Sequence, residues 1–165
     1  MQTYKTTSWV RAQSRMAELH EKRPGFAQHL IDIARAAQLA YEALMTAYGG
    51  QPIGIECRSP KREQWAFIAP NIQTMSPFRV QVFDADGFIS HHGFDSLELA
   101  AEDMINSGYR VIDEGALHRM SATDRWATGI ARLDIMQQVN DGRITWARAA
   151  ELLNELPHID VATLS

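Results

Sequence analysis

The spacing of apolar residues changes twice along this chain of 165 residues. Over residues 1–50, and again over residues 116–156, apolar side chains recur every three or four positions, the spacing of one face of a helix. Over residues 51–115 short segments alternate between apolar and polar, the spacing of one face of a strand. The order of helix, sheet and helix excludes all-α and all-β folds. It predicts one α+β domain spanning residues 1–165.

Residues 1–50 are predicted to form a helical hairpin. Thr7 and Ser8 can cap the first helix, and Gly49-Gly50 ends the second. Because the break at residues 22–25 is short, the two helices should be antiparallel. The expected buried stripes are Trp9, Ala12, Met16 and Leu19 in the first helix and Phe26, Leu30, Ile33, Ala37, Tyr41, Leu44 and Tyr48 in the second.

Residues 51–115 are predicted to form a small antiparallel sheet with one packed helix. Strands are expected over residues 52–57, 64–70, 78–83, 88–91 and 109–113. The turn at residues 84–87 ends in Asp-Gly, a strong signal for a hairpin between alternating strands. In the strand before it, Val80 and Val82 should face the core, whereas Arg79 and Gln81 should face solvent.

Three further helices are predicted from capping residues and apolar spacing. One begins after Asp95 and Ser96 and lies against the sheet. The other two, capped by Thr123 or Asp124 and by Thr145, form a second helical hairpin within residues 116–156. Residues 157–165 form a tail that is expected to be loosely held.

Charge is divided unevenly along the chain. Residues 1–62 hold nine Lys and Arg against five Asp and Glu, whereas residues 63–165 hold seven against fifteen. The formal net charge of −4 excludes a basic protein that coats nucleic acid, and it falls short of a DNA mimic. The two halves can pair their charges internally, or a local basic surface can face a partner.

The single cysteine, Cys57, excludes an internal disulfide and a zinc site built from several thiolates. Residues 1–5 carry no apolar run typical of an export signal, and no segment approaches the roughly 20 apolar residues that span a bilayer. We therefore expect a cytoplasmic protein without a cofactor. Cys57 ends an apolar strand, which predicts a buried and inert thiol. The neighbouring Arg58, Lys61 and Arg62 would instead lower its pKa and favour thiol chemistry.

Asp84 and Asp86 are the first candidates for catalysis. Residues 80–87, an apolar strand followed by Asp-x-Asp-Gly, resemble the first motif of the haloacid-dehalogenase-like phosphatases. The resemblance implies a nucleophile at Asp84, a general acid at Asp86 and a magnesium ion between carboxylate and phosphate. The sequence departs from that family, because Phe88 replaces its threonine and no lysine follows Lys61. A hairpin turn is therefore the preferred interpretation.

His91 and His92, with Asp95 nearby, are the candidate metal ligands or general bases. Adjacent residues of a strand point to opposite faces, so the two histidines cannot bind one ion without distortion. None of the six histidines has a recognised zinc-binding spacing. We expect structural or surface histidines and no metal site.

Residues 142–153 resemble the first half of the helix-turn-helix of transposases and regulators, through Gly-x-Ile-Thr followed by Ala-Ala-x-Leu-Leu. In that family a basic recognition helix follows and enters the major groove. Here an acidic segment broken by Pro157 follows instead. The sequence therefore predicts a plain helical hairpin rather than a DNA reader.

A basic segment, residues 58–62, precedes the aromatic residues Trp65 and Phe67. Cations beside aromatic rings can bind phosphate and stack a base, and a solvated loop is the alternative. The four tryptophans, at positions 9, 65, 126 and 146, lie on apolar stripes or in the sheet and are expected in the core. The candidate partner-binding residues are Arg58, Lys61, Arg62, Trp65, Arg11 and Arg15, provided that the fold gathers them.

The run from Gln64 to Asp113 combines the Asp-Gly hairpin with Asp-Ser-Leu-Glu-Leu-Ala at residues 95–100 and Ser-Gly-Tyr-Arg at residues 107–110. It resembles small accessory proteins of phages, plasmids and integrative elements of GC-rich proteobacteria, over about a third of the chain. The resemblance implies a setting in which small proteins without catalytic motifs bind and block host complexes. The leading hypothesis is a non-enzymatic interaction protein from a bacterial mobile element. It would bind a larger protein or ribonucleoprotein and inhibit a defence system such as CRISPR-Cas.

Two other functions stay open. The first is an accessory or regulatory protein that binds nucleic acid through its basic N-terminal half, with an affinity that falls as salt rises. The second is a metal-dependent hydrolase that uses Asp84, Asp86 and His91 or His92. Either helical hairpin could also pair with a second copy, because each has an apolar stripe, which would give a homodimer.

Overall fold

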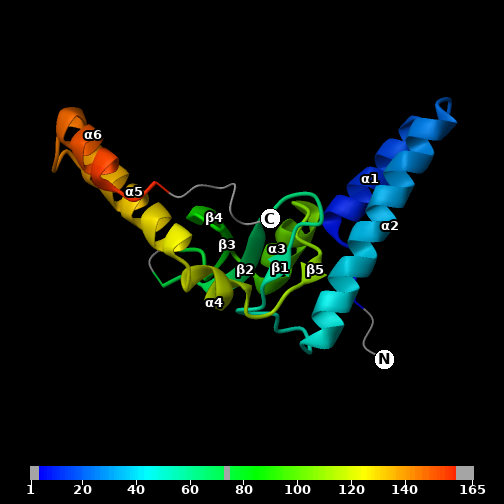
Figure 1. The fold of residues 1–165 in the computed structure, drawn as a ribbon. Helices are drawn as coiled ribbons and strands as arrows, with labels where there is room; N and C mark the ends of the chain where they lie inside the picture. The colour runs from blue at the N-terminus through cyan, green and yellow to red at the C-terminus, as the bar shows by residue number, and fades with distance from the viewer. Residues whose placement is uncertain (1–3, 73–74, 159–165) are drawn as a thin grey trace. The chain divides into compact units, whose positions relative to one another are not determined.

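In chain order the protein forms helices, then an antiparallel sheet with one further helix, then helices again, which is an α+β fold (Figure 1). This computed structural model describes residues 4–72 and 75–158. The elements in chain order are α1 (Ser8–Leu19), α2 (Pro24–Ala47), β1 (Cys57–Arg58), β2 (Trp65–Pro70), β3 (Phe78–Asp84), β4 (Gly87–Phe94), α3 (Leu97–Asn106), β5 (Val111–Ile112), α4 (Ala116–Ser121), α5 (Asp124–Asn140) and α6 (Trp146–Glu155). Most of the tail predicted at 157–165 lies outside the described residues.

Four helices begin at a Ser or Thr that the sequence identifies as a cap. In each, the side-chain oxygen accepts a hydrogen bond from the backbone N–H three residues later, at 3.1–3.3 Å. The caps are Thr7, Ser96, Thr123 and Thr145. Such a bond satisfies a backbone donor that has no partner within the first helical turn.

The sheet has the strand order β4-β3-β2-β1-β5. Cys57 in β1 pairs with Ala66 on one side and with Ile112 on the other. The strand predicted at 52–57 is reduced to β1 and a single bridge from Ile53 to Ile68, since Gly54 turns the backbone with a φ of +77°. The hairpin between β3 and β4 is confirmed, with a two-residue turn.

The chain divides into two compact units, residues 1–82 with 90–114 and residues 83–89 with 115–165. We call these unit 1 and unit 2. The tip of the β3–β4 hairpin belongs to unit 2, whereas the rest of the sheet belongs to unit 1.

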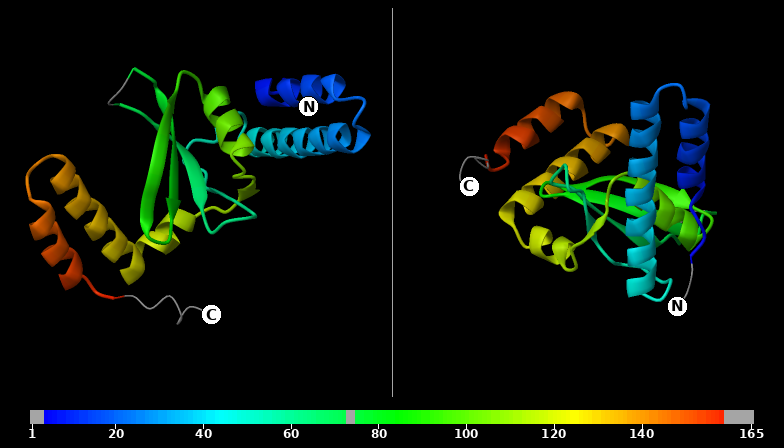
Figure 2. Two further views of the ribbon diagram at one scale, coloured as in Figure 1. Left: turned by 90° about the horizontal axis from the view of Figure 1, so that it is seen from above. Right: turned by 90° about the vertical axis from the view of Figure 1, so that its right-hand side faces the viewer.

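Unit 1 is built around an apolar cluster shared by α2, α3 and the sheet. Its buried members include Leu44, Ile68 and Met104, each no more than 1% exposed. α1 lies alongside α2, as both views of Figure 2 show. It contacts the cluster through Val10 and the partly buried Trp9, whereas Ala12, Met16 and Leu19 are exposed. The stripe predicted for α1 was therefore wrong beyond Trp9, because the helix is covered on one narrow face only.

Gln81 also departs from its predicted position. Its side chain is buried, and its Nε2 donates a hydrogen bond to the backbone oxygen of Ser90 at 2.9 Å. The hydrogen bond to β4 satisfies the amide, which allows a polar side chain to leave solvent. Val80 and Val82 are buried as expected.

Unit 2 is built from the hairpin tip, α4, α5 and α6. The indole ring of Trp126 on α5 makes edge contacts with the rings of Phe83 and Phe88 on the hairpin. α6 packs against α5 and buries Ala149, whereas Trp146 is 66% exposed. The expectation that all four tryptophans fill the core was thus wrong for Trp146.

Candidate functional site

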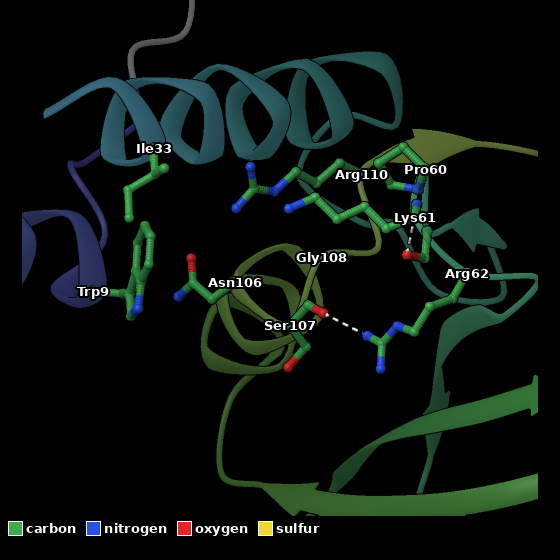
Figure 3. A pocket seen from close by; sticks show the side chains of 10 residues that line it. Trp9, Ile33, Pro60, Lys61, Arg62, Asn106, Ser107, Gly108 and Arg110 are labelled. Carbon is green, nitrogen blue, oxygen red and sulfur yellow. Dashed lines mark hydrogen bonds between the residues drawn. The ribbon is translucent and has the colours of Figure 1, made fainter. Parts of the chain in front are cut away.

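Unit 1 carries a surface cleft of about 410 Å³ in which three cations gather (Figure 3). The cations are Lys61, Arg62 and Arg110, and no Asp or Glu among the described residues lines the cleft. The described residues that line it are Trp9, Ile33, Ser59, Pro60, Lys61, Arg62, Asn106, Ser107, Gly108 and Arg110. We call this surface the cationic cleft. Its volume lies within the range of small-ligand sites.

The loop after β1 presents Lys61 and Arg62 in a fixed conformation. Ser59 is buried, and its N–H donates to the oxygen of Gln64 at 2.9 Å, closing the loop. The Ser59 Oγ accepts from the N–H of Lys61 at 3.3 Å. Pro60 between them has a fixed φ, which further restricts the loop.

The two arginines are positioned by carbonyl oxygens near the C-terminal end of α3. Arg62 Nη2 donates to the oxygen of Ser107 at 3.2 Å, and Arg110 Nε donates to the oxygen of Ile105 at 3.0 Å. The carbonyl end of a helix carries partial negative charge and favours cations. The Arg62 guanidinium also lies 5.8 Å from the centre of the Tyr109 ring. Neither bond neutralises a cation, because both acceptors are uncharged.

The other end of the cationic cleft is apolar. It is formed by Trp9 of α1 and Ile33 of α2, while Asn106 lies between them and the cations in Figure 3. Trp9 is partly buried against the core, and its backbone N–H donates to Glu102 Oε1 at 2.8 Å. The backbone of Trp9 is therefore anchored at the edge of the cleft.

The cleft differs from the basic patch predicted from the sequence. Lys61 and Arg62 lie together in it, but Trp65 is buried and its Nε1 donates to Asp113 Oδ2 at 2.7 Å. Arg11 lines another pocket, beside Glu98 and Glu102, and Arg15 lines neither pocket. The exposed Arg58 lies on β1 outside the cleft lining.

Trp9, Asn106 and Arg110 join the cleft although sequence reasoning assigned them no partner contact. Trp9 was expected in the core, and Arg110 follows the end of α3. Ser107, the acceptor of Arg62, is 45 positions away from it in the chain. No local pattern links residues at that separation.

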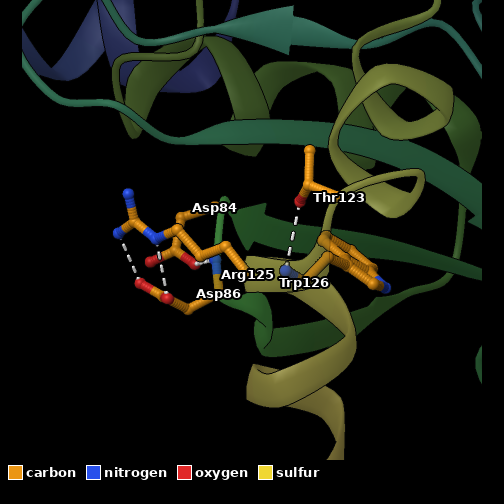
Figure 4. Close-up of polar contacts among 5 residues, drawn as sticks. All are labelled: Asp84, Asp86, Thr123, Arg125 and Trp126. Atoms are coloured by element: carbon orange, nitrogen blue, oxygen red, sulfur yellow. Dashed lines mark hydrogen bonds and ion pairs between the residues drawn. The ribbon is translucent and has the colours of Figure 1, made fainter. Parts of the chain in front are cut away.

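Asp84 and Asp86 both make structural contacts in unit 2 (Figure 4). Asp84 Oδ1 accepts from the N–H of Asp86 at 2.7 Å within the turn. Asp86 receives two hydrogen bonds from Arg125, from Nε at 2.8 Å and from Nη2 at 2.6 Å. The Arg125 guanidinium holds the pKa of Asp86 below its usual value.

His91 and His92 are exposed on β4. Within residues 4–72 and 75–158, no group of three or more His, Cys, Asp or Glu side chains is placed to hold a metal ion. The thiol of Cys57 is fully buried, and burial raises its pKa to about 12. The suggestion that the nearby cations lower this pKa was therefore wrong, and the thiol keeps its proton at neutral pH.

α5 and α6 form the helical hairpin expected for residues 142–153 and their neighbours. After α6, the described residues up to His158 contain no further helix. In the part of the chain that the structure describes, no helix has the length and apolar character needed to cross a lipid bilayer. No protein family, curated protein or solved structure matches this chain.

Proposed function

We propose that this protein is a non-enzymatic interaction protein that docks onto a larger protein or ribonucleoprotein through the cationic cleft. One observation carries the proposal: Lys61, Arg62 and Arg110 line a single cleft, and none of the described residues that line it is an Asp or Glu. Three unneutralised cations within one cleft favour an anionic partner. Tryptophan and arginine, both present in the lining, are also the residues that most often anchor protein interfaces.

The position of the charge agrees with a docking role. The chain as a whole has a net charge of −4, so it repels polyanions except where its cations are concentrated. A local basic surface on an acidic protein selects partners by geometry, because a partner must fit its negative charge into the cleft.

The proposed partner is a bacterial defence complex such as a CRISPR-Cas effector, met in the cytoplasm of the host. The resemblance of residues 64–113 to accessory proteins of mobile elements supports this setting. Such effectors carry a guide RNA, whose phosphates supply negative charge. A protein bound to that surface would block defence by occupying it, without chemistry of its own.

Phage infection tests the proposal directly. The protein is expressed in a panel of bacterial strains, each with one active CRISPR-Cas type that targets a test phage. We expect plaques to return by orders of magnitude in at least one strain. Lys61→Glu and Arg110→Glu should abolish this rescue, because each reverses a charge in the cationic cleft.

Two matched variants control for charge alone. Lys22→Glu and Arg35→Glu make the same changes at exposed residues outside the cleft lining, and they should keep the rescue. No rescue in any strain would overturn the defence role. Equal rescue by the cleft variants and the controls would overturn docking through the cleft.

A further inference from the structure

We infer that the cationic cleft binds one nucleotide, with its phosphate among Lys61, Arg62 and Arg110 and its base against Trp9. The inference rests on the proposed function, since it names what the cleft recognises in its partner. The ligand chemistry is a phosphate joined to a planar heterocycle. This chemistry is shared by a nucleotide within single-stranded RNA or DNA and by a free mononucleotide.

The cleft has two chemically different ends, as a nucleotide does. Lys61 and Arg110 extend into it from one side, and Trp9 and Ile33 face it from the other (Figure 3). An acidic peptide would satisfy the cations but leave the indole without a matching group. Inorganic phosphate would occupy only one end of a volume of about 410 Å³.

The hydrogen-bond donors at the cationic end are largely unused. Arg110 donates a hydrogen bond from Nε to the oxygen of Ile105, which leaves both of its Nη groups for a ligand. Within the described residues, the Lys61 ammonium has no hydrogen bond or ion pair. A guanidinium fork beside an ammonium is a favourable arrangement for phosphate oxygens.

The apolar end can hold a base. A half-buried indole that is anchored through its backbone offers a surface for stacking, which tolerates every base. Ile33 adds apolar contact on the same side. The Asn106 amide, with donors and an acceptor, is placed between the two ends, where it can bond to a base edge or a sugar.

Arg62 is shared with a second cleft of about 300 Å³, which Asp103 and His92 also line. Because Arg62 lines both clefts, a change at this position would alter both of them. Lys61 and Arg110 line the cationic cleft and none of the other pockets compared with it, so they are the better positions for a test.

The experiment measures fluorescence anisotropy of labelled eight-nucleotide oligo(U) and oligo(dT) as the full chain is added. Lys61→Gln and Arg110→Gln should each weaken binding several-fold and reduce the slope of log K against log salt by about 0.7. Lys22→Gln and Arg35→Gln, exposed residues outside the cleft, are the matched controls and should match the wild type.

A pair of variants isolates the stacking contact. Trp9→Leu keeps apolar volume but removes the aromatic face, so binding should weaken roughly tenfold, whereas Trp9→Phe should keep most of the affinity. Protection of the buried Cys57 thiol from labelling confirms that each variant is folded. Unlabelled AMP and inorganic phosphate serve as competitors, which distinguishes binding of a nucleotide within a strand from binding of a free nucleotide or of phosphate alone.

The outcomes divide as follows. Oligonucleotide binding that needs Lys61, Arg110 and Trp9 supports the inference. If AMP competes with the oligonucleotide, a free nucleotide is a sufficient ligand. If AMP does not compete, the site binds nucleotides of single-stranded nucleic acid. No binding, or binding unchanged in Trp9→Leu and displaced by phosphate alone, overturns it. Phage rescue without nucleotide binding leaves the proposed function intact and overturns only the nucleotide site. Nucleotide binding without phage rescue overturns the proposed function and leaves the nucleotide site intact.

Discussion

Units 1 and 2 are stabilised by different kinds of contact. Unit 1 buries a continuous apolar cluster to which α2, α3 and three strands contribute. Unit 2 depends on a few specific contacts, namely the Trp126 ring cluster, the Asp86–Arg125 ion pair and the backbone of Gly129 against the turn. Unit 1 should therefore resist surface changes but not core truncation. The stability of unit 2 should instead be sensitive to single substitutions at the residues that make these contacts.

In unit 1 the largest effect is expected in the apolar core. Leu44→Ala should destabilise by about 2–5 kcal/mol, because Leu44 is 1% exposed and its removal leaves a cavity. Leu39→Ala, on the same helix but 57% exposed, should cost less than about 0.5 kcal/mol. Labelling of Cys57 under increasing urea measures opening of unit 1. Equal labelling of both variants would contradict a core centred on α2.

Gly129→Ala should cost about 1–3 kcal/mol and loosen unit 2. A Cβ at position 129 would lie 1.7 Å from the backbone oxygen of Asp86, so the hairpin tip and α5 must separate. Hydrogen exchange of peptides from α5 and the tip should rise. Gly25→Ala in α2, which has open space around it, is the control. A comparable rise in exchange throughout unit 1 would show that the two units unfold as one.

Asp86→Asn should destabilise unit 2 by up to about 1 kcal/mol at neutral pH, a small value because Asp86 is half-exposed. Arg125 lowers the pKa of Asp86 in the folded state. The stabilisation is thus complete above the unfolded pKa of about 3.9 and is lost as pH falls through the folded value. Thermal unfolding of wild type and Asp86→Asn should converge as the pH falls below the folded pKa of Asp86. Glu63→Gln, in an exposed loop, is the control, and a difference between wild type and Asp86→Asn that stays constant as the pH falls would exclude the ion pair as its cause.

The smallest effect is expected at Trp146. Since this side chain is 66% exposed on α6, Trp146→Ala should change stability by less than about 0.5 kcal/mol. Trp126→Ala, at a buried tryptophan of the same unit, should cost about 3–5 kcal/mol. Chemical denaturation of both variants makes the comparison. A large loss at Trp146 would mean that a second copy or another partner covers it.

The predictions that succeeded concern neighbours in the chain. Thr145 was identified as a cap, and Thr123 as one of two candidates, because a cap bonds to an N–H only three residues away. The turn predicted at residues 84–87 was recognised for the same reason, since the turn type depends on those residues. The overall α+β order followed from the period of apolar residues.

The predictions that failed concern burial on faces that look alike in sequence. Trp65 and Trp146 both occupy apolar patterns, yet Trp65 in β2 is buried and Trp146 on α6 is exposed. Gln81 was placed in solvent by its polarity, but a hydrogen bond to β4 allows it to be buried. Which face is covered depends on elements far away in the chain, and local spacing carries no information about them.

The sequence by itself determined most of the elements, the Ser and Thr caps, the hairpin and the basic loop that holds Lys61 and Arg62. Only the tertiary structure decided that Arg110 and Trp9 share a cleft with this loop. Caps and turns are fixed by hydrogen bonds between residues a few positions apart. The cationic cleft instead requires α1, α2 and the end of α3 to pack around the loop after β1, and that packing is decided by the apolar core of unit 1 as a whole.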